Sequence, residues 1–156
     1  DTYMEQSSRC FKLAARVYLR LICLDANLTS LALVDMQNDL VHALSLVINE
    51  DQTRRAFPMW PLFIAGCASC EDEHRKLILD MFRTLERKWP IGNIIYVRNV
   101  TTRIWQSRDL NGYDDNSRRH DWQRLITTFG WKLELSWKEK KGMLRPLETP
   151  DRILLM

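Results

Sequence analysis

Hydrophobic residues recur at helical spacing along most of this chain. Apolar side chains at positions i, i+3, i+4 and i+7 share one face of an α-helix, whereas strict alternation would indicate a strand. Only residues 131–135 alternate in that way. The helical spacing occurs in five segments, at residues 11–22, 33–48, 77–85, 94–105 and 119–129, whereas residues 60–68 are apolar throughout.

The composition fits a helical fold. Among 156 residues there are five glycines and five prolines, too few for the many turns of a β-sandwich or barrel. Hydrophobic residues make up 46% of the chain, enough for one core of ordinary domain size. The sequence therefore predicts an all-α fold, an irregular bundle of antiparallel helices numbering about five to seven.

Short polar residues precede several predicted helices, and their side chains can accept the backbone N–H groups that a helix start leaves unbonded. On this ground Ser7 or Ser8 is expected to cap the first helix, Thr29 or Ser30 the second, and Asn93 the fifth. The side chains predicted to face the core include Phe11, Tyr18, Leu21, Gln37, Leu77, Phe82, Val97 and Trp105.

The most distinctive stretch, residues 57–68, is apolar all round, which predicts a helix buried on most sides. Pro61 suits the first helical turn, where its missing N–H is not needed. Gly66 would cost about 1 kcal/mol relative to alanine in a helix, so we expect it to admit a close neighbour. The acidic residues 71–73 favour the start of a new helix, where the helix dipole attracts negative charge.

Charge and cysteine usage narrow the function classes. The 23 basic and 20 acidic residues are interleaved, which does not predict a DNA-binding face. The basic cluster at 138–145 is interpreted as a solvated tail.

The four cysteines form no disulfide framework, so reduced thiols in the cytosol or nucleus are expected. No apolar run approaches the roughly 20 residues of a membrane span.

Candidate metal and redox sites are weak. Cys67 and Cys70 form a lone C-x-x-C that His74 follows. On one continuous helix Cys67 and His74 would lie about 10 Å apart, too far to share a metal ion. Buried core cysteines are therefore the preferred interpretation.

Candidate catalytic residues are equally weak. The polar span from Asp109 to Asp115 places Gly112 too early for an EF-hand calcium loop. His120 and Asp121 could pair as a base and its carboxylate, but no activated nucleophile accompanies them. No phosphate-binding, zinc-protease or hydrolase motif is present in the sequence. The sequence predicts that the chain is not an enzyme.

Three sequence blocks in order carry a family resemblance: residues 60–68 followed by 73–75, residues 104–109, and residues 121–122 with 130–131. With them the chain resembles the carboxy-terminal part of the helical regulatory domain of fungal zinc-cluster transcription factors. The resemblance covers about residues 10–136. The residues that carry it and that we expect to hold the helices together are Trp60, Pro61, Phe63, Gly66, Arg75, Trp105, Arg108, Asp109, Asp121 and Trp122.

The resemblance implies a nuclear regulatory domain over residues 1–136, with a C-terminal extension over 137–156. The implied partners are transcription machinery or co-regulators, with a small-molecule effector and a homodimer left open and no membrane. DNA would be reached only through the family's N-terminal zinc cluster, so no cofactor is expected within this chain. Arg75, Arg108 and Asp109 are candidates for ion pairs.

Two alternatives remain open on the residues alone. One is a helical enzyme whose site is assembled from distant positions, and the other is a free-standing scaffold domain. The chain begins at Asp1 without a methionine and soon enters helical periodicity, so we expect it to be part of a larger protein.

Overall fold

A computed structural model describes residues 2–22, 30–49, 57–89 and 92–110 of the chain. These residues form five helices and contain no strand. The helices are α1 (Thr2–Ile22), α2 (Leu31–Asn49), α3 (Met59–Ala68), α4 (Asp72–Lys88) and α5 (Gly92–Leu110). The predicted all-α bundle is confirmed. Residues 119–129 and 131–135, predicted as a helix and a strand-like arm, lie outside the described residues.

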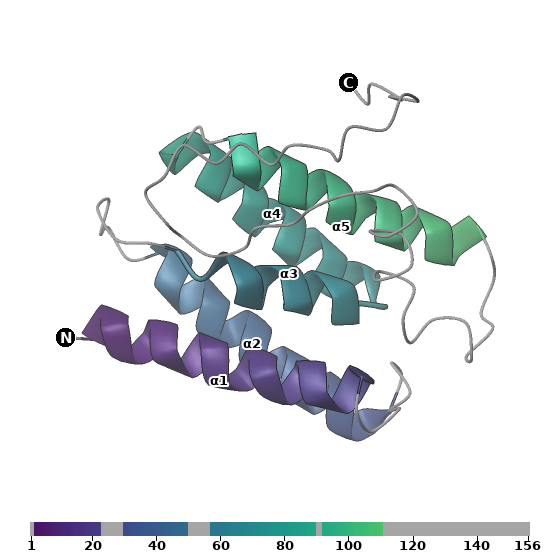
Figure 1. Ribbon diagram of the computed structural model, residues 1–156, viewed down its shortest axis with the longest axis horizontal. Helices are drawn as coiled ribbons and strands as arrows, with labels where there is room; N and C mark the ends of the chain where they lie inside the picture. Colours follow the sequence, from purple (N-terminus) through teal and green to yellow (C-terminus); the bar gives the residue numbers. More distant parts are fainter. Residues whose placement is uncertain (1, 23–29, 50–56, 90–91, 111–156) are drawn as a thin grey trace.

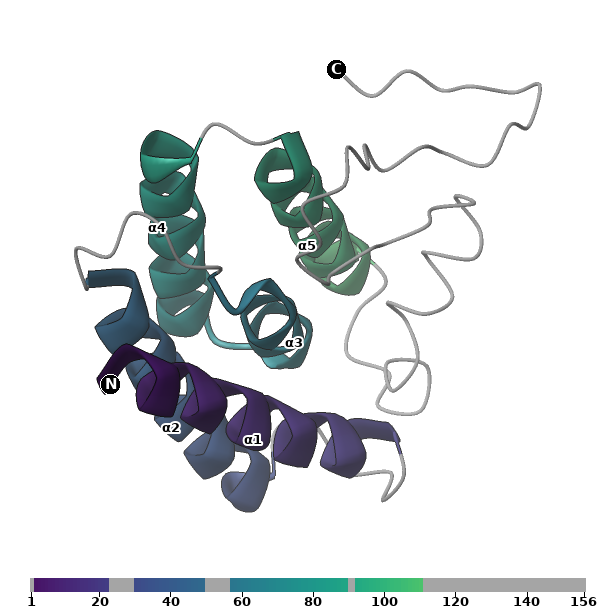
Figure 2. The ribbon, with the colours of Figure 1, turned by 60° about the vertical axis from the view of Figure 1, so that its left-hand side comes forward.

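Helix α3 occupies the centre of the bundle. It contacts all four other helices, with α1 and α2 on one side and α4 and α5 on the other (Figure 1). Figure 2 looks nearly along α3 and shows the other helices around it. Every residue from Pro61 to Ala68 is buried, which explains why this segment is apolar all round.

The other helices bury one stripe each. In α2 the predicted stripe is confirmed, with Leu33, Leu40 and Leu44 fully buried. In α4, Ile78, Phe82 and Leu85 face the core. The full core comprises Tyr3, Cys10, Ala14, Val17, Leu21, Leu33, Leu40, Val41, Ala43, Leu44, Val47, Ile48, Phe57, Leu62, Phe63, Ile64, Ala65, Cys67, Ala68, Ile78, Met81, Phe82, Leu85, Ile94, Val97, Val100, Ile104 and Trp105.

Two predicted helix starts are wrong. Helix α1 begins at Thr2, well before Ser7 and Ser8, because Tyr3 is 3% exposed and anchors an additional first turn in the core. Helix α5 begins at Gly92, so Asn93 lies within its first turn instead of capping it. The start of α2 is as predicted, because Ser30 directly precedes it and its carbonyl accepts the first two helical N–H bonds.

Two predicted core faces need correction. Phe11 is 46% exposed and Tyr18 is only half-buried, because Cys10, Ala14 and Val17 form the core face of α1. Leu77 is 49% exposed, and His74, one turn earlier on α4, is buried instead. In both helices an additional hydrophobic residue on the flank shifted the predicted face away from the true one.

Candidate functional site

The motif residues of three helices meet where α3 passes α5. We call this the motif junction and define it by Gly66, Arg75, Thr101, Trp105 and Asp109. Gly66 lies on α3, Arg75 on α4 and the other three on α5. Residues as far apart in the chain as Gly66 and Asp109 are therefore brought to one place.

Gly66 makes the close approach of α3 and α5 possible. A Cβ atom built on Gly66 would lie 2.5 Å from Cγ2 of Thr101, closer than real Cβ contacts allow. Thr101 is fully buried, and its hydroxyl donates a 2.9 Å hydrogen bond to the Val97 carbonyl. Glycine at position 66 therefore fits a steric requirement of the packing.

The end of α3 obtains its hydrogen bonds from the surrounding helices. The last carbonyls of a helix have no partner within it. The Gly66 carbonyl accepts bonds from the Trp105 indole at 2.9 Å and from the Ser69 backbone at 3.2 Å. The Ala65 carbonyl accepts from the Gln37 amide at 3.2 Å and the Ser69 hydroxyl at 2.8 Å.

Arg75 links α4 to α5. Its guanidinium donates from one nitrogen to both carboxylate oxygens of Asp109, at 3.0 and 2.9 Å. It also lies 5.5 Å from the centre of the Trp105 ring, within the range of a cation–π contact. The Arg75 side chain is only 13% exposed, whereas Asp109 is 54% exposed, so the pair lies at the edge of the bundle.

A second polar cluster joins α2 to the α3–α4 turn. Gln37, 3% exposed, donates to the Ser69 hydroxyl as well as to Ala65. His74 Nε2 and Asn38 Oδ1 are 2.7 Å apart, which adds a contact between α2 and α4. Buried polar groups need such partners, because an unbonded one costs about 1–3 kcal/mol.

The remaining motif residues have separate positions. Phe63 and Pro61 are buried on α3, and Trp60 is half-buried at its start. Arg108 is 6% exposed near the end of α5, and an ion of this kind is costly to bury without compensation. Asp121 and Trp122 lie outside the described residues, as do His120 and the basic cluster at 138–145.

Sequence reasoning missed two contacts: the contact of Thr101 with Gly66 in the motif junction and the hydrogen bonds of Gln37 at the end of α3. Thr101 lies four residues after Val97 and four before Trp105, so helical spacing already placed it on the buried face. Gln37 was placed on the core face, but its partners at the end of α3 are 28 and 32 residues away. No local pattern encodes contacts at that separation.

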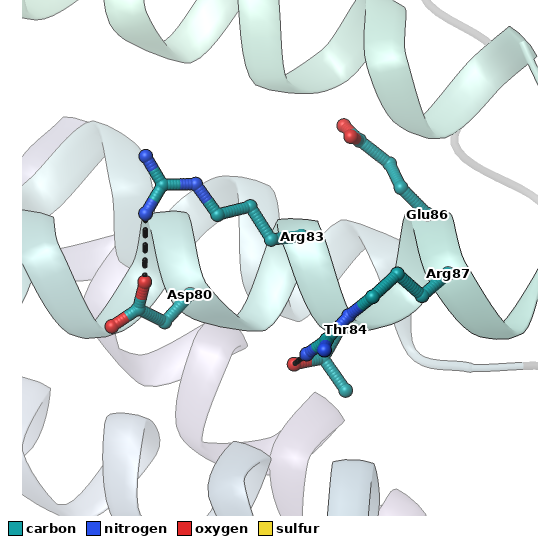
Figure 3. A pocket seen from close by; sticks show the side chains of 5 residues that line it. All are labelled: Asp80, Arg83, Thr84, Glu86 and Arg87. Atoms are coloured by element: carbon teal, nitrogen blue, oxygen red, sulfur yellow. Dashed lines mark hydrogen bonds and ion pairs between the residues drawn. The ribbon is translucent and has the colours of Figure 1, made fainter.

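A surface depression on α4 is the other candidate for a site. It has a volume of about 570 Å³ and is lined by Asp80, Arg83, Thr84, Glu86 and Arg87 (Figure 3). Arg83 pairs with Asp80 at 3.0 Å, and Arg87 donates to Thr84 at 3.2 Å. Glu86 accepts from Arg98 of α5 at 3.1 Å. These charges are mostly engaged with one another, so the depression offers no pre-arranged acid–base pair.

The cysteines behave as core residues where they are described. Cys10 and Cys67 are buried, and Cys70 is half-buried. Burial raises the pKa of the Cys10 thiol from 9.0 to about 11, which disfavours the reactive thiolate. Within the described segments no three His, Cys, Asp or Glu side chains are grouped to hold a metal ion.

Helix α2 has the length and mean hydropathy of a membrane span, although 44% of that 18-residue window is buried inside the bundle. A core helix of a water-soluble fold gives the same signal, and the buried residues of α2 pack in the common core. The sequence predicted that no apolar run approaches the length of a membrane span. By length and composition alone, α2 is an exception to that prediction.

Comparison with known protein families identifies the family of this chain. The family model for the fungal-specific transcription factor domain matches residues 2–136. The chain belongs to this family. No curated protein and no solved structure matches it.

Membership in the fungal transcription factor domain family establishes a role in transcription regulation. A nuclear location follows for the family in general. The match begins within the first turn of α1 and includes the whole motif junction. It also extends past α5, so residues 111–136 belong to the same family domain.

Proposed function

We propose that this fungal transcription factor domain regulates transcription through contacts with other proteins in the nucleus. The observation that carries the proposal is the family match over residues 2–136. The partners would be co-regulators or the transcription machinery, and DNA would be reached through a zinc cluster that is not part of this chain.

The arrangement of the helices supports a role in presenting surfaces. The motif junction and the Gln37 cluster tie α2, α4 and α5 to the end of α3. Such cross-links hold the outer faces of α2, α4 and α5 in fixed relative positions. A partner that contacts two of these helices would therefore meet a preformed surface, which lowers the entropy cost of binding.

Catalysis is the less supported alternative. An active site needs ionisable groups that converge on a reacting atom. The described clusters consist instead of mutually paired side chains, such as Arg75 with Asp109 and Arg83 with Asp80. Effector binding and homodimer formation remain finer proposals, which the same experiment can address.

The test separates regulation from DNA binding in the intact protein. Gly66→Val should loosen the contact with Thr101 and change transcript levels at target promoters, while promoter occupancy stays at its normal level. Arg83→Ala, on the exposed face of α4, is the matched control and should change neither. If transcript levels follow occupancy alone in every variant, the chain is not a regulatory domain.

Effector binding has a separate readout. The intact protein, purified from its native host, would be analysed by mass spectrometry under non-denaturing conditions for retained small molecules. A stoichiometric ligand would establish the effector version of the proposal. A ligand-free protein that still captures co-regulators through this domain would leave protein contacts as the mechanism.

A further inference from the structure

Helix α1 lies at the outside of the described bundle (Figure 2) and carries hydrophobic side chains that the core does not use. Met4, Phe11 and Leu19 are 61%, 46% and 51% exposed. At about 100° per residue they fall within an arc of about 80° on the helix surface, in a row about 22 Å long. We call these three residues the apolar row. The Phe11 ring stacks on Trp60 of α3, with the ring centres 6.1 Å apart and 10° between the planes, so α3 supports one side of the row.

Small residues separate the large side chains of the apolar row. Ser8 lies between Met4 and Phe11, four and three residues from them. Ala15 lies four residues from both Phe11 and Leu19. Residues at these spacings share one face of a helix, so projections and depressions alternate along the row. Side chains of a second helix pack into a surface of this kind.

Three cations lie along one side of the apolar row. Arg9, Lys12 and Arg16 are exposed, and they occupy the next arc of about 60° on α1. Within the described residues no carboxylate forms an ion pair with any of the three, whereas Arg75 and Arg83 of α4 each pair with an aspartate. We call Arg9, Lys12 and Arg16 the basic edge. Its charge is not neutralised by the described part of the chain.

We propose that the apolar row and the basic edge form a docking site for an acidic amphipathic helix of a partner protein. The proposal rests on the proposed regulation through protein contacts and states the chemistry of one partner. Apolar side chains of that helix would lie on Met4, Phe11 and Leu19, and its acidic side chains would lie beside the basic edge. About 15 residues, or four turns, match the length of the row.

Charge and shape together favour this occupant. A second copy docked through the same face would bring two basic edges together, because α1 contains four basic residues and only one acidic residue, Glu5. Lipid headgroups or nucleic-acid phosphates would attract the basic edge, but they have no side chains to fill the depressions at Ser8 and Ala15. An acidic helix satisfies both features.

Binding of designed peptides to the intact protein, followed by fluorescence anisotropy, tests the site. One 18-residue peptide carries leucine on one helical face with glutamate and alanine elsewhere, and the other has lysine in place of glutamate. The acidic peptide should bind at least about tenfold more tightly, and its affinity should fall as salt is added. Lys12→Glu should weaken its binding at least about fivefold. Lys76→Glu, the same charge change at an exposed position of α4, is the control and should leave binding unchanged.

The apolar contribution is tested in the same way. Phe11→Asp should weaken binding of the acidic peptide at least about tenfold, because a central aromatic contact is lost. Leu77→Asp is the matched control, since Leu77 of α4 is 49% exposed and lies outside the site. If Phe11→Asp unfolds the protein, Lys12→Glu and Arg16→Glu decide, because both replace exposed side chains.

Three results would overturn the proposal: equal affinity for the two peptides, binding that Lys12→Glu leaves unchanged, or a preference for anionic lipid vesicles over the acidic peptide. A dimer that Phe11→Asp dissociates in sedimentation experiments would also overturn it, by assigning the face to a second copy. If the acidic peptide fails to bind while Gly66→Val still changes transcript levels at normal promoter occupancy, the docking site is wrong and the regulatory role stands.

Discussion

Gly66 is the residue at which the packing leaves least freedom. The missing Cβ is what lets α3 approach Thr101 of α5, and Thr101 cannot move because it is fully buried and bonded to Val97. We expect Gly66→Ala to reduce the free energy of unfolding by about 1–3 kcal/mol, the usual cost of overpacking. Denaturant titration followed by circular dichroism measures it.

Gly92 provides the control for that substitution. A Cβ at Gly92 would meet nothing within 4 Å, and the residue starts a helix, so Gly92→Ala should be neutral or stabilising by up to about 1 kcal/mol. Adding Thr101→Ser, which removes the clashing Cγ2 atom, should restore part of the stability of Gly66→Ala. Additive effects of the two changes would show that the clash is not the cause.

Arg75 and Arg83 allow one substitution to be compared in two environments. Arg75→Lys keeps the charge but loses the planar contact with Trp105 and the paired bonds to Asp109, and should cost about 1–2 kcal/mol of unfolding free energy. Arg83→Lys affects an ion pair exposed at both ends and should cost less than about 0.5 kcal/mol. Equal costs would mean that Arg75 contributes only as a surface charge.

The environment of a single residue can be predicted from sequence where one property of that residue determines how it packs. A glycine in an otherwise apolar helix has few explanations, and Gly66 has the expected close neighbour. Phe11 was misplaced because hydrophobicity alone favours burial, while the partner of its ring, Trp60, is 49 positions away in the chain. Local pattern contains no information about such a partner.

At the scale of elements, the Gln37 side chain of α2 joins that helix to the end of α3 by hydrogen bonds. Gln37→Ala removes the bonds to Ala65 and Ser69 and leaves a void, so we expect a loss of about 2–3 kcal/mol. Hydrogen exchange should accelerate first in α3. Gln106→Ala, an exposed glutamine of α5, is the control and should leave exchange unchanged. Uniform acceleration across all helices would argue against local anchoring.

The sequence predicted which helices exist better than where they begin. Hydrophobic spacing identified α2, α3 and α4 because their stripes are long and uninterrupted. The starts of α1 and α5 were placed too late, since the capping rule favours any serine or asparagine near a helix start. Tyr3, whose burial extends α1, contacts the core through tertiary packing that no capping rule includes.

For the whole molecule, the burial of Cys10 in the core makes the free energy of unfolding decrease at alkaline pH. Its pKa is about 11 when folded and 9.0 in the reference state, so the folded form holds the proton more tightly. The stabilisation is complete below about pH 9 and decreases as the pH rises toward 11, by about 1–2 kcal/mol. Urea titrations between pH 8 and 10.5 should show a steeper decline for the wild type than for Cys10→Ala. Parallel curves would contradict the prediction.

The position of α3 also decides how the described bundle unfolds. Because α3 contacts each of the other helices, none of them can separate without uncovering it. The motif junction and the Gln37 cluster both attach to its last turn. Loss of that turn would break the hydrogen bonds from Gln37 of α2 and from Trp105 of α5 together.

The contact between Gly66 and Thr101 also has a consequence for evolution. The two positions share one fixed volume, so a change at either is tolerated only when the other compensates. Lineages that acquire alanine or serine at position 66 should carry glycine, alanine or serine at position 101. An alignment of related sequences should then show correlated substitutions at these two positions, although they lie 35 residues apart in the chain.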